Sequence, residues 1–304
     1  MRKQISLALG GGGARGLSHL GAISALEEHG IPIDRVVGTS IGSISGALYA
    51  IHGAARPAIE AAKEYLRSAR FRRNSLHQAM AMSREQGYGL VSSIASTLRK
   101  HLAYQMIINR RSLFKPERLY ELLSGIIDPA FRIEDTRIPM AVTAVNLLEG
   151  REVLIRSGSL LDAMMASSSL PGIFPPVAAG NMLLADYGVV NSVPVEAARA
   201  FGGDVVIAID TTSGLPRYET GELDSGLDQM LRVAQIASRI IDDLAIRSAD
   251  YVIHPEVGSI FWADFTLSDE LMLKGRVAAL KALPTLIRDL APVPVAWHRP
   301  APGI

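Results

Sequence analysis

The first 52 residues alternate two short apolar runs with two helical patterns, and a glycine-rich turn separates each apolar run from the helix that follows it. Residues 4–9 and 34–39 have the composition of short strands, whereas residues 17–29 and 41–51 have the residue spacing of helices. A strand–helix–strand–helix order is typical of a parallel sheet covered by helices. The opening of the chain therefore predicts an α/β fold.

The rest of the chain continues the alternation after an interruption. Strand patterns occur at 138–145, 151–156, 181–185, 204–210 and 251–253, and helical patterns at 159–169, 194–200, 226–248 and 269–290. Residues 57–125 carry no strand pattern and look mostly helical, so we expect them to cap the edge of the sheet. We expect one domain over 1–292, with 57–130 as its helical cap region and a proline-rich, extended tail at 293–304.

Composition narrows the class of protein. Hydrophobic residues make up 48% of the chain and charged residues 20%, which is the balance of a folded globular protein. A net charge of +1 argues against a nucleic-acid binder. The absence of cysteine excludes disulfides, thiolate metal sites and a cysteine nucleophile. The apolar runs are too short for a secretion signal or a membrane span, so we expect a cytoplasmic protein.

Basic residues gather in one part of the chain. Residues 56–118 hold 13 basic and 4 acidic residues, although the whole chain is nearly neutral. Such a segment either contacts anionic lipid headgroups at a membrane surface or forms a solvated helical face. The oligomeric state leaves no mark in the sequence.

The seven residues from Gly10 to Gly16, GGGGARG, follow the first strand and open the first helix. Glycines allow backbone N–H groups to point inward and form an anion-binding nest at a helix N-terminus. Gly11, Gly13 and Gly16 also satisfy the dinucleotide-binding pattern, but no acidic residue ends the next strand to hold a ribose. An oxyanion hole is the better interpretation, and each of its donors is typically worth about 3–4 kcal/mol of barrier.

Gly38, Thr39, Ser40, Ile41 and Gly42 form a Gly-x-Ser-x-Gly motif between the second strand and the second helix. This is the context in which the motif exposes a nucleophilic serine on a sharp turn. The N-terminus of the following helix directs its positive end toward a developing oxyanion. We therefore predict that Ser40 is a nucleophile.

A serine nucleophile needs a group that accepts its proton. Of seven histidines, His254 is in the right order for a Ser-Asp-His hydrolase, but no recognisable signature surrounds it. Asp186 follows a strand pattern and enters a loop, where catalytic residues are often found. Asp210 also ends a strand, so these residues alone leave Asp186 only modestly ahead.

In this order the motifs resemble the patatin-like phospholipase family, and in particular its bacterial members related to neuropathy target esterase. Four blocks within residues 4–212 carry the resemblance: Gly10–Gly16 with His19-Leu20-Gly21, Gly38–Gly42, Ala166–Pro176, and Asp186-Tyr187-Gly188 with the following Val189-Val190-Asn191 and Pro194. The resemblance implies a three-layer α/β/α sandwich with a mostly parallel central sheet. It also implies hydrolysis of acyl esters of lipids, with neither metal nor cofactor.

The resemblance assigns roles to individual residues. Ser40 attacks the ester carbonyl and Asp186 takes its proton directly, without a histidine. The donors of the oxyanion hole are then the backbone N–H groups of Gly11, Gly12 and Gly13. Arg15 braces the loop. The other supporting positions are Gly16, Gly38, Gly42 and Gly188.

Tyr187 departs from the family pattern, which has glycine after the aspartate. Tyrosine resists a positive φ and adds bulk near Ser40. Two alternatives to the esterase therefore remain: a regulatory or lipid-binding protein with weakened catalysis, and a Ser-Asp-His hydrolase that uses His254.

Overall fold

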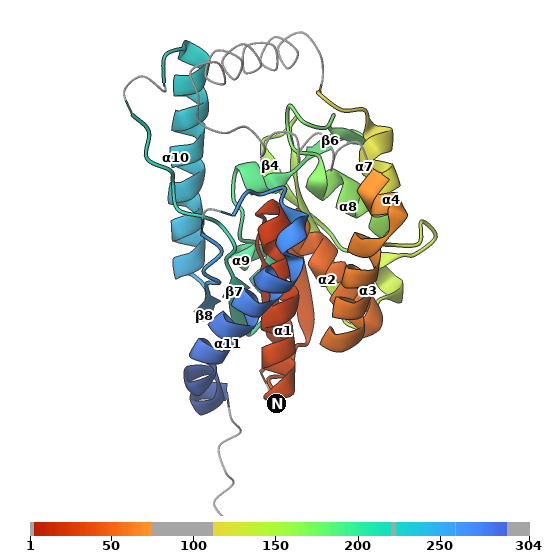
Figure 1. Ribbon diagram of the computed structural model, residues 1–304, viewed down its shortest axis with the longest axis vertical. Coiled ribbons are helices and arrows are strands. Elements are labelled where there is room, and N and C mark those ends of the chain that lie inside the picture. Colours follow the sequence, from red (N-terminus) through yellow and green to blue (C-terminus); the bar gives the residue numbers. More distant parts are fainter. Residues whose placement is uncertain (1–2, 74–111, 220–222, 259, 291–304) are drawn as a thin grey trace, which may run out of the picture.

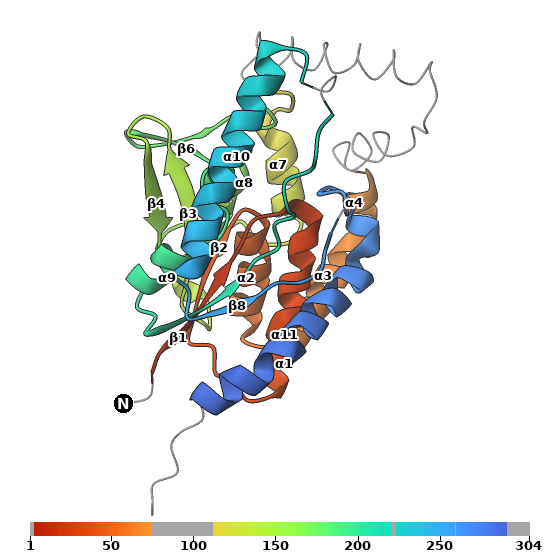
Figure 2. The same ribbon diagram turned by 90° about the vertical axis from the view of Figure 1, so that its left-hand side faces the viewer.

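The computed structural model describes residues 3–73, 112–219, 223–258 and 260–290. Figures 1 and 2 show a twisted sheet with helices on both faces. The α/β architecture with a mostly parallel sheet is thereby confirmed.

Five strands form the parallel part of the sheet and three antiparallel strands extend it. Their order is β5-β6-β3-β2-β1-β7-β8, and β4 also pairs with β3. The strands are β1 (Ile5–Leu9), β2 (Arg35–Thr39), β3 (Met140–Asn146), β4 (Arg151–Ile155), β5 (Val177–Ala179), β6 (Met182–Ala185), β7 (Val205–Ile209) and β8 (Tyr251–Ile253). The pairs β1–β2, β1–β7, β2–β3 and β7–β8 are parallel.

Alternation along the central strands builds a separate core on each face of the sheet. In β1, Leu7 and Leu9 belong to the larger core, whereas Ala8 belongs to the smaller one. In β7, Ile207 likewise faces the larger core and Ala208 the smaller one. Because successive side chains of a strand point to opposite faces, two buried faces require a helical layer on each side.

The helices on the larger core are α1 (Ser18–Glu28), α2 (Ile41–His52), α3 (Ala55–Arg67), α8 (Leu160–Ser168) and α11 (Ser268–Leu290). The smaller core is covered by α9 (Val195–Ala200), against which the long α10 (Gly226–Arg247) packs. Two short helices, α4 (Ala69–Arg73) and α7 (Pro116–Leu123), complete the described part of the basic segment. Among the described helices, none is long and apolar enough to cross a membrane.

Two details differ from the sequence predictions. The glycine loop continues into a 3-10 helix, η1 (Gly13–Leu17), before α1 begins. The short strand β5 was not predicted, since three residues carry too little periodicity. Within the expected cap region, α3 packs on α1 and α2 in the helical layer. Most of the cap region, 74–111, and the tail lie outside the described residues, so the domain division remains a prediction.

Candidate active site

The turn at Ser40 is a strained strand-to-helix elbow. Ser40 has φ 53° and ψ −123°, and it alone among the described non-glycine residues has a positive φ. Such a conformation costs about 1–3 kcal/mol and is concentrated at functional sites. A Cβ on Gly38 would lie 2.4 Å from the backbone of Gly42, and one on Gly42 would lie 2.1 Å from the carbonyl oxygen of Leu9. Both glycines therefore permit backbone contacts that no other residue allows.

Ser40 and Asp186 meet because two strands run toward each other along one edge of β3. Thr39 at the end of β2 pairs with Thr143, and Ala185 at the end of β6 pairs with Val145. Since β4 occupies the other edge of β3, β6 lies on the same edge as β2. The next residue of each strand, Ser40 or Asp186, therefore enters the same space.

The carboxyl group of Asp186 is buried and hydrogen-bonded. It accepts a hydrogen bond from the N–H of Gly188 at 2.8 Å, and it lies beside the Ser40 side chain in the same cavity. Burial raises the pKa of Asp186 to about 6, although the Ser40 side chain and the N–H of Gly188 lower it. A Cβ on Gly188 would approach Oδ1 of Asp186 to 3.0 Å, so glycine leaves room for this contact. Asp186 therefore has the position and the pKa of a proton acceptor near neutral pH.

The segment before Asp186 holds the backbone of both Ser40 and Asp186. The hydroxyl of Ser167 accepts a hydrogen bond from the N–H of Ser40 at 2.8 Å. The carbonyl oxygen of Ser169 accepts one from the N–H of Asp186 at 3.0 Å. The Ala166–Pro176 block thus has a specific structural task, which its sequence alone did not reveal.

The glycine loop lies beside Ser40 but offers fewer donors than expected. The N–H of Gly11 donates to the carbonyl oxygen of Ser192 at 3.1 Å, so the prediction of Gly11 as an oxyanion donor is wrong. Within the described residues, no acceptor faces the N–H groups of Gly12 and Gly13, which line the cavity at Ser40. Their φ angles of 144° and 62° are suited to glycine, and this backbone exposes two adjacent donors.

Three side chains hold the glycine loop in place through hydrogen bonds to its carbonyl oxygens. Nε of Arg15 donates to the carbonyl oxygen of Gly12 at 3.0 Å, and a second guanidinium nitrogen donates to Ser213. The buried ring of His19 contacts the carbonyl oxygen of Gly10 at 2.8 Å, and burial lowers its pKa to about 4, so the neutral ring donates this bond from Nε2. The hydroxyl of Thr211 donates to the carbonyl oxygen of Gly11. Gly16 brings η1 close to α2, since a Cβ there would overlap Ile41.

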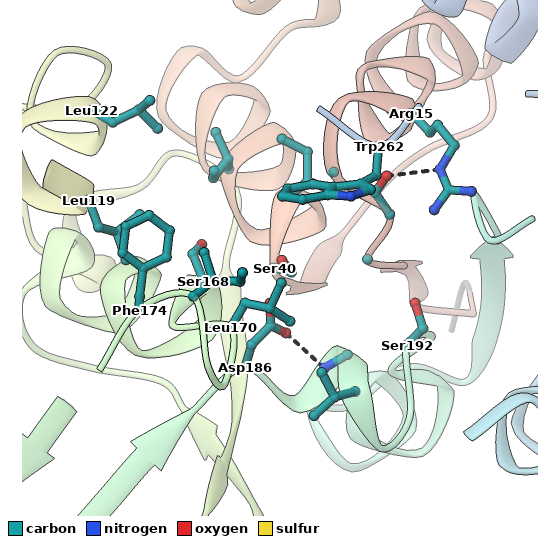
Figure 3. Close-up of a pocket in the computed structure, with 18 of the residues that line it drawn as sticks. Arg15, Ser40, Leu119, Leu122, Ser168, Leu170, Phe174, Asp186, Ser192 and Trp262 are labelled. Carbon is teal, nitrogen blue, oxygen red and sulfur yellow. Dashed lines mark hydrogen bonds between the residues drawn. The ribbon is translucent and has the colours of Figure 1, made fainter. Parts of the chain in front are cut away.

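A cavity of about 320 Å³ opens at these residues. Ser40, Asp186 and the glycine loop lie together in it, and Figure 3 shows Ser40 and Asp186 next to each other below Trp262. The remaining wall is mostly apolar and includes Ile44, Leu119, Leu122, Leu170, Phe174 and Trp262. An apolar cavity with a few converging polar groups is the usual form of a small-molecule site.

The histidine alternative does not fit this geometry. His254 lies outside the cavity at Ser40, and its Nδ1 contacts Oδ2 of Asp210 at 3.1 Å. The hydrogen bond to Asp210 raises the pKa of His254. Neither residue lines the cavity, so His254 is not placed to accept the proton of Ser40.

Tyr187 is accommodated without strain. Its φ is not positive, because Ser40 is the one described non-glycine residue with a positive φ. Its side chain is half-buried, lies outside the cavity and hydrogen-bonds Asn191, while burial and the nearby Glu152 raise its pKa. The departure from the family pattern therefore leaves the space around Ser40 open.

The cavity and support residues that were not predicted include Ser192, Thr211, Trp262 and Asp242. Thr211, Trp262 and Asp242 lie outside the four motif blocks, and the contacts of all four residues depend on pairing between distant parts of the chain. The carbonyl oxygen of Trp262 illustrates this, since it accepts the N–H of Ala14 and fills the space that a Cβ on Gly13 would need.

Comparison with known proteins agrees with this site. The family description "Patatin-like phospholipase" matches residues 7–199, more than half of the chain. Patatin-like phospholipase domain-containing protein 6 of Mus musculus is 33% identical over 211 residues, which cover 69% of this chain and 14% of that protein. Lysophospholipase NTE1 of Kluyveromyces lactis is 35% identical over 209 residues, which cover 69% of this chain and 13% of that protein.

An uncharacterized NTE family protein of Mycobacterium tuberculosis is 28% identical over 311 residues, which cover 94% of this chain and 48% of that protein. The chain thus spans less than half the length of each of these relatives. Among solved structures, VipD of Legionella pneumophila has a TM-score of 0.47 and 15% identity, with 93% of this chain and 67% of that chain covered.

The mostly parallel sheet and the strained serine turn define an α/β protein with a Gly-x-Ser-x-Gly elbow between a strand and a helix. Within that class, the chain belongs to the patatin-like phospholipase family, as its four motif blocks predicted.

Proposed function

We propose that the protein is a serine acyl hydrolase that cleaves carboxylic esters of lipids through Ser40 and Asp186. The observation that carries the proposal is the contact between the Ser40 hydroxyl and the buried Asp186 carboxyl inside an apolar cavity. Family membership supports a lipid ester as the substrate, because related chains include a lysophospholipase.

In the first half-reaction, Oγ of Ser40 attacks the ester carbonyl carbon while Asp186 takes the hydroxyl proton. The resulting tetrahedral oxyanion is stabilised by the N–H groups of Gly12 and Gly13, assisted by the N-terminus of α2. The C–O bond to the alcohol then breaks, and the alcohol leaves with the proton from Asp186. The product is a fatty acyl ester of Ser40.

In the second half-reaction, water attacks the acyl-enzyme and transfers a proton to Asp186. The second tetrahedral species collapses, the fatty acid leaves, and the proton returns to Oγ of Ser40. A carboxylate can serve as the base here because burial raises the pKa of Asp186 to about 6, close to neutral pH.

An alkyl fluorophosphonate, which phosphonylates activated serines, tests the proposal. Mass spectrometry of the labelled protein should locate the adduct on Ser40. Ser40→Ala and Asp186→Asn should each lower turnover of a chromogenic acyl ester by at least about a thousand-fold. Ser43→Ala is a suitable control, since Ser43 is a serine of α2 whose hydroxyl donates to the carbonyl oxygen of Ser40. An adduct on another residue, or full activity of Ser40→Ala, rejects the proposal.

We also propose that the basic segment 56–118 contacts anionic lipid surfaces. In its described part, Arg70, Arg73 and Arg118 surround a surface hollow of about 250 Å³ together with Glu121. Co-sedimentation with vesicles should increase when phosphatidylserine is added to phosphatidylcholine, and it should decrease with salt. Binding that ignores both variables removes this part of the proposal.

A further inference from the structure

A second, smaller chamber lies behind the cavity at Ser40. This rear chamber of about 50 Å³ is lined by residues of α2, α3, α4 and α7, and we define it by Leu48, Ala62, Tyr65, Leu66, Phe71 and Ile126. Four further side chains line both spaces: Ile41, Ile44, Leu122 and Phe265. The two chambers are therefore separated only by apolar side chains.

The common wall leads away from the nucleophile along one face of α2. Ile41 follows Ser40 directly, Ile44 lies one turn further, and Leu48 lies one turn beyond that. Residues at this spacing share a helix face, and seven residues of helix rise by about 10 Å. A chain that starts at Ser40 and follows this face reaches the rear chamber.

The rear chamber offers no free polar group to water. Among the residues that line it, none is charged, and its two polar side chains are already bonded. Ser45 donates to the carbonyl oxygen of Gly16 at 3.1 Å, and the hydroxyl of Tyr65 donates to the carbonyl oxygen of Leu122 at 2.7 Å. Because a buried water needs two to four polar partners, the chamber is suited to hydrocarbon.

Three aromatic rings line the rear chamber. The rings of Tyr65 and Phe71 pack edge to face at 5.4 Å, and those of Phe71 and Phe265 do so at 5.5 Å. Phe265 lines both chambers and therefore belongs to their common wall.

We propose that the rear chamber receives the methyl end of a long fatty acyl chain whose ester carbonyl lies at Ser40. This inference rests on the proposed hydrolase function and adds to it a preference for long acyl chains. Short acyl chains end in the first cavity and make no contact with the rear chamber.

Ala62 is the position from which to test this. Ala62 is buried, lines the rear chamber and does not line the cavity at Ser40. Ala62→Leu fills the rear chamber from α3 and leaves the catalytic residues in place. Ala61→Leu adds the same atoms to the same helix outside the lining of either chamber, and it is the matched control.

The measurement is kcat/KM for p-nitrophenyl butyrate and for p-nitrophenyl palmitate in mixed micelles. Ala62→Leu should lower the value for palmitate by about ten-fold, the loss expected when a methylene group or more no longer fits an apolar pocket. The value for butyrate should stay within about two-fold, and Ala61→Leu should leave both values near wild type. Equal responses of the two esters to Ala62→Leu overturn the proposal.

Two further results keep the test decisive. If Ala62→Leu does not fold, Leu66→Phe, at a half-buried position on the rim of the rear chamber, gives the same comparison. If the wild-type protein hydrolyses butyrate but Leu66→Phe treats both esters as wild type does, the rear chamber is not an acyl site and the hydrolase proposal survives. If the wild-type protein hydrolyses neither ester, the hydrolase proposal fails and the chain-length preference fails with it.

Discussion

The carboxylate of Asp242 on α10 accepts a hydrogen bond from the backbone N–H of Ser192 at 2.5 Å. Ser192 in turn accepts the N–H of Gly11 through its carbonyl oxygen, so α10 is connected to the glycine loop through one residue. Asp242 is buried, and burial raises its pKa to about 7. Asp242, which lies far from the motifs in the sequence, therefore supports the loop of the proposed oxyanion hole through Ser192.

We predict that Asp242→Ala lowers kcat roughly ten-fold to a hundred-fold with little change in KM, because a small displacement of the loop weakens transition-state binding. The unpaired Ser192 N–H should also lower the free energy of unfolding by about 1–3 kcal/mol. Asp242→Asn, whose amide oxygen still accepts, should recover part of kcat. Asp243→Ala, at the partly exposed neighbouring carboxylate, is the control, and an unchanged kcat in Asp242→Ala contradicts the role.

The pH dependence of turnover should report the ionisation of Asp186. Its carboxylate accepts the proton of Ser40, so kcat/KM for a short acyl ester should rise with pH through about 6 and then level off. Rates measured from pH 4 to 8, together with the rate of fluorophosphonate labelling, check this. A profile that is flat across pH 6 shows that another group takes the proton.

The same residue should reduce stability at neutral pH. The folded pKa of Asp186, about 6, lies above the unfolded value of about 3.9, so the folded state binds this proton more tightly. Its contribution to stability is therefore present at low pH and is lost as pH rises from about 4 to 6. The free energy of unfolding of Asp186→Asn, relative to wild type, should increase by roughly 2 kcal/mol over that range. Urea unfolding at pH 4 and at pH 7 measures the change, and a constant difference contradicts it.

His254→Ala should retain turnover within about two-fold, because His254 lies outside the cavity at Ser40. The hydrogen bond to Asp210 raises the pKa of His254, so the pair stabilises the fold below the unfolded pKa of histidine and less as pH rises. The variant should thus lose most stability at acidic pH. Abolished turnover in a folded His254→Ala protein would restore the Ser-Asp-His alternative.

Tyr187→Gly restores the family's residue after the aspartate, and we expect it not to raise turnover of any acyl ester. The tyrosine adopts no positive φ and does not line the cavity. Steady-state kinetics with butyrate and palmitate esters test this, with Tyr187→Phe as the control that removes only the hydroxyl. A turnover that appears only in Tyr187→Gly favours the regulatory or lipid-binding alternative.

The motif blocks could be recognised in the sequence because each depends on residues that lie close together in the chain. Gly38 and Gly42 surround Ser40 within five residues, and the strand-to-helix turn that they permit depends on their own backbone contacts. Likewise, strand and helix periodicity was enough to predict the α/β fold. The sequence could not show which N–H groups of the glycine loop are already bonded, since the hydrogen bond from Gly11 to Ser192 depends on a distant segment.

By itself, therefore, the sequence determined the α/β fold, the elbow at Ser40 and the glycine-rich turn after β1, because each depends on residues that are close in the chain. Only the tertiary structure decided that Asp186 and Ser40 share one cavity, that no described residue accepts the N–H groups of Gly12 and Gly13, and that a rear chamber extends along α2. These depend on strand register and on the packing of separate helices, where one displaced residue turns a side chain to the other face.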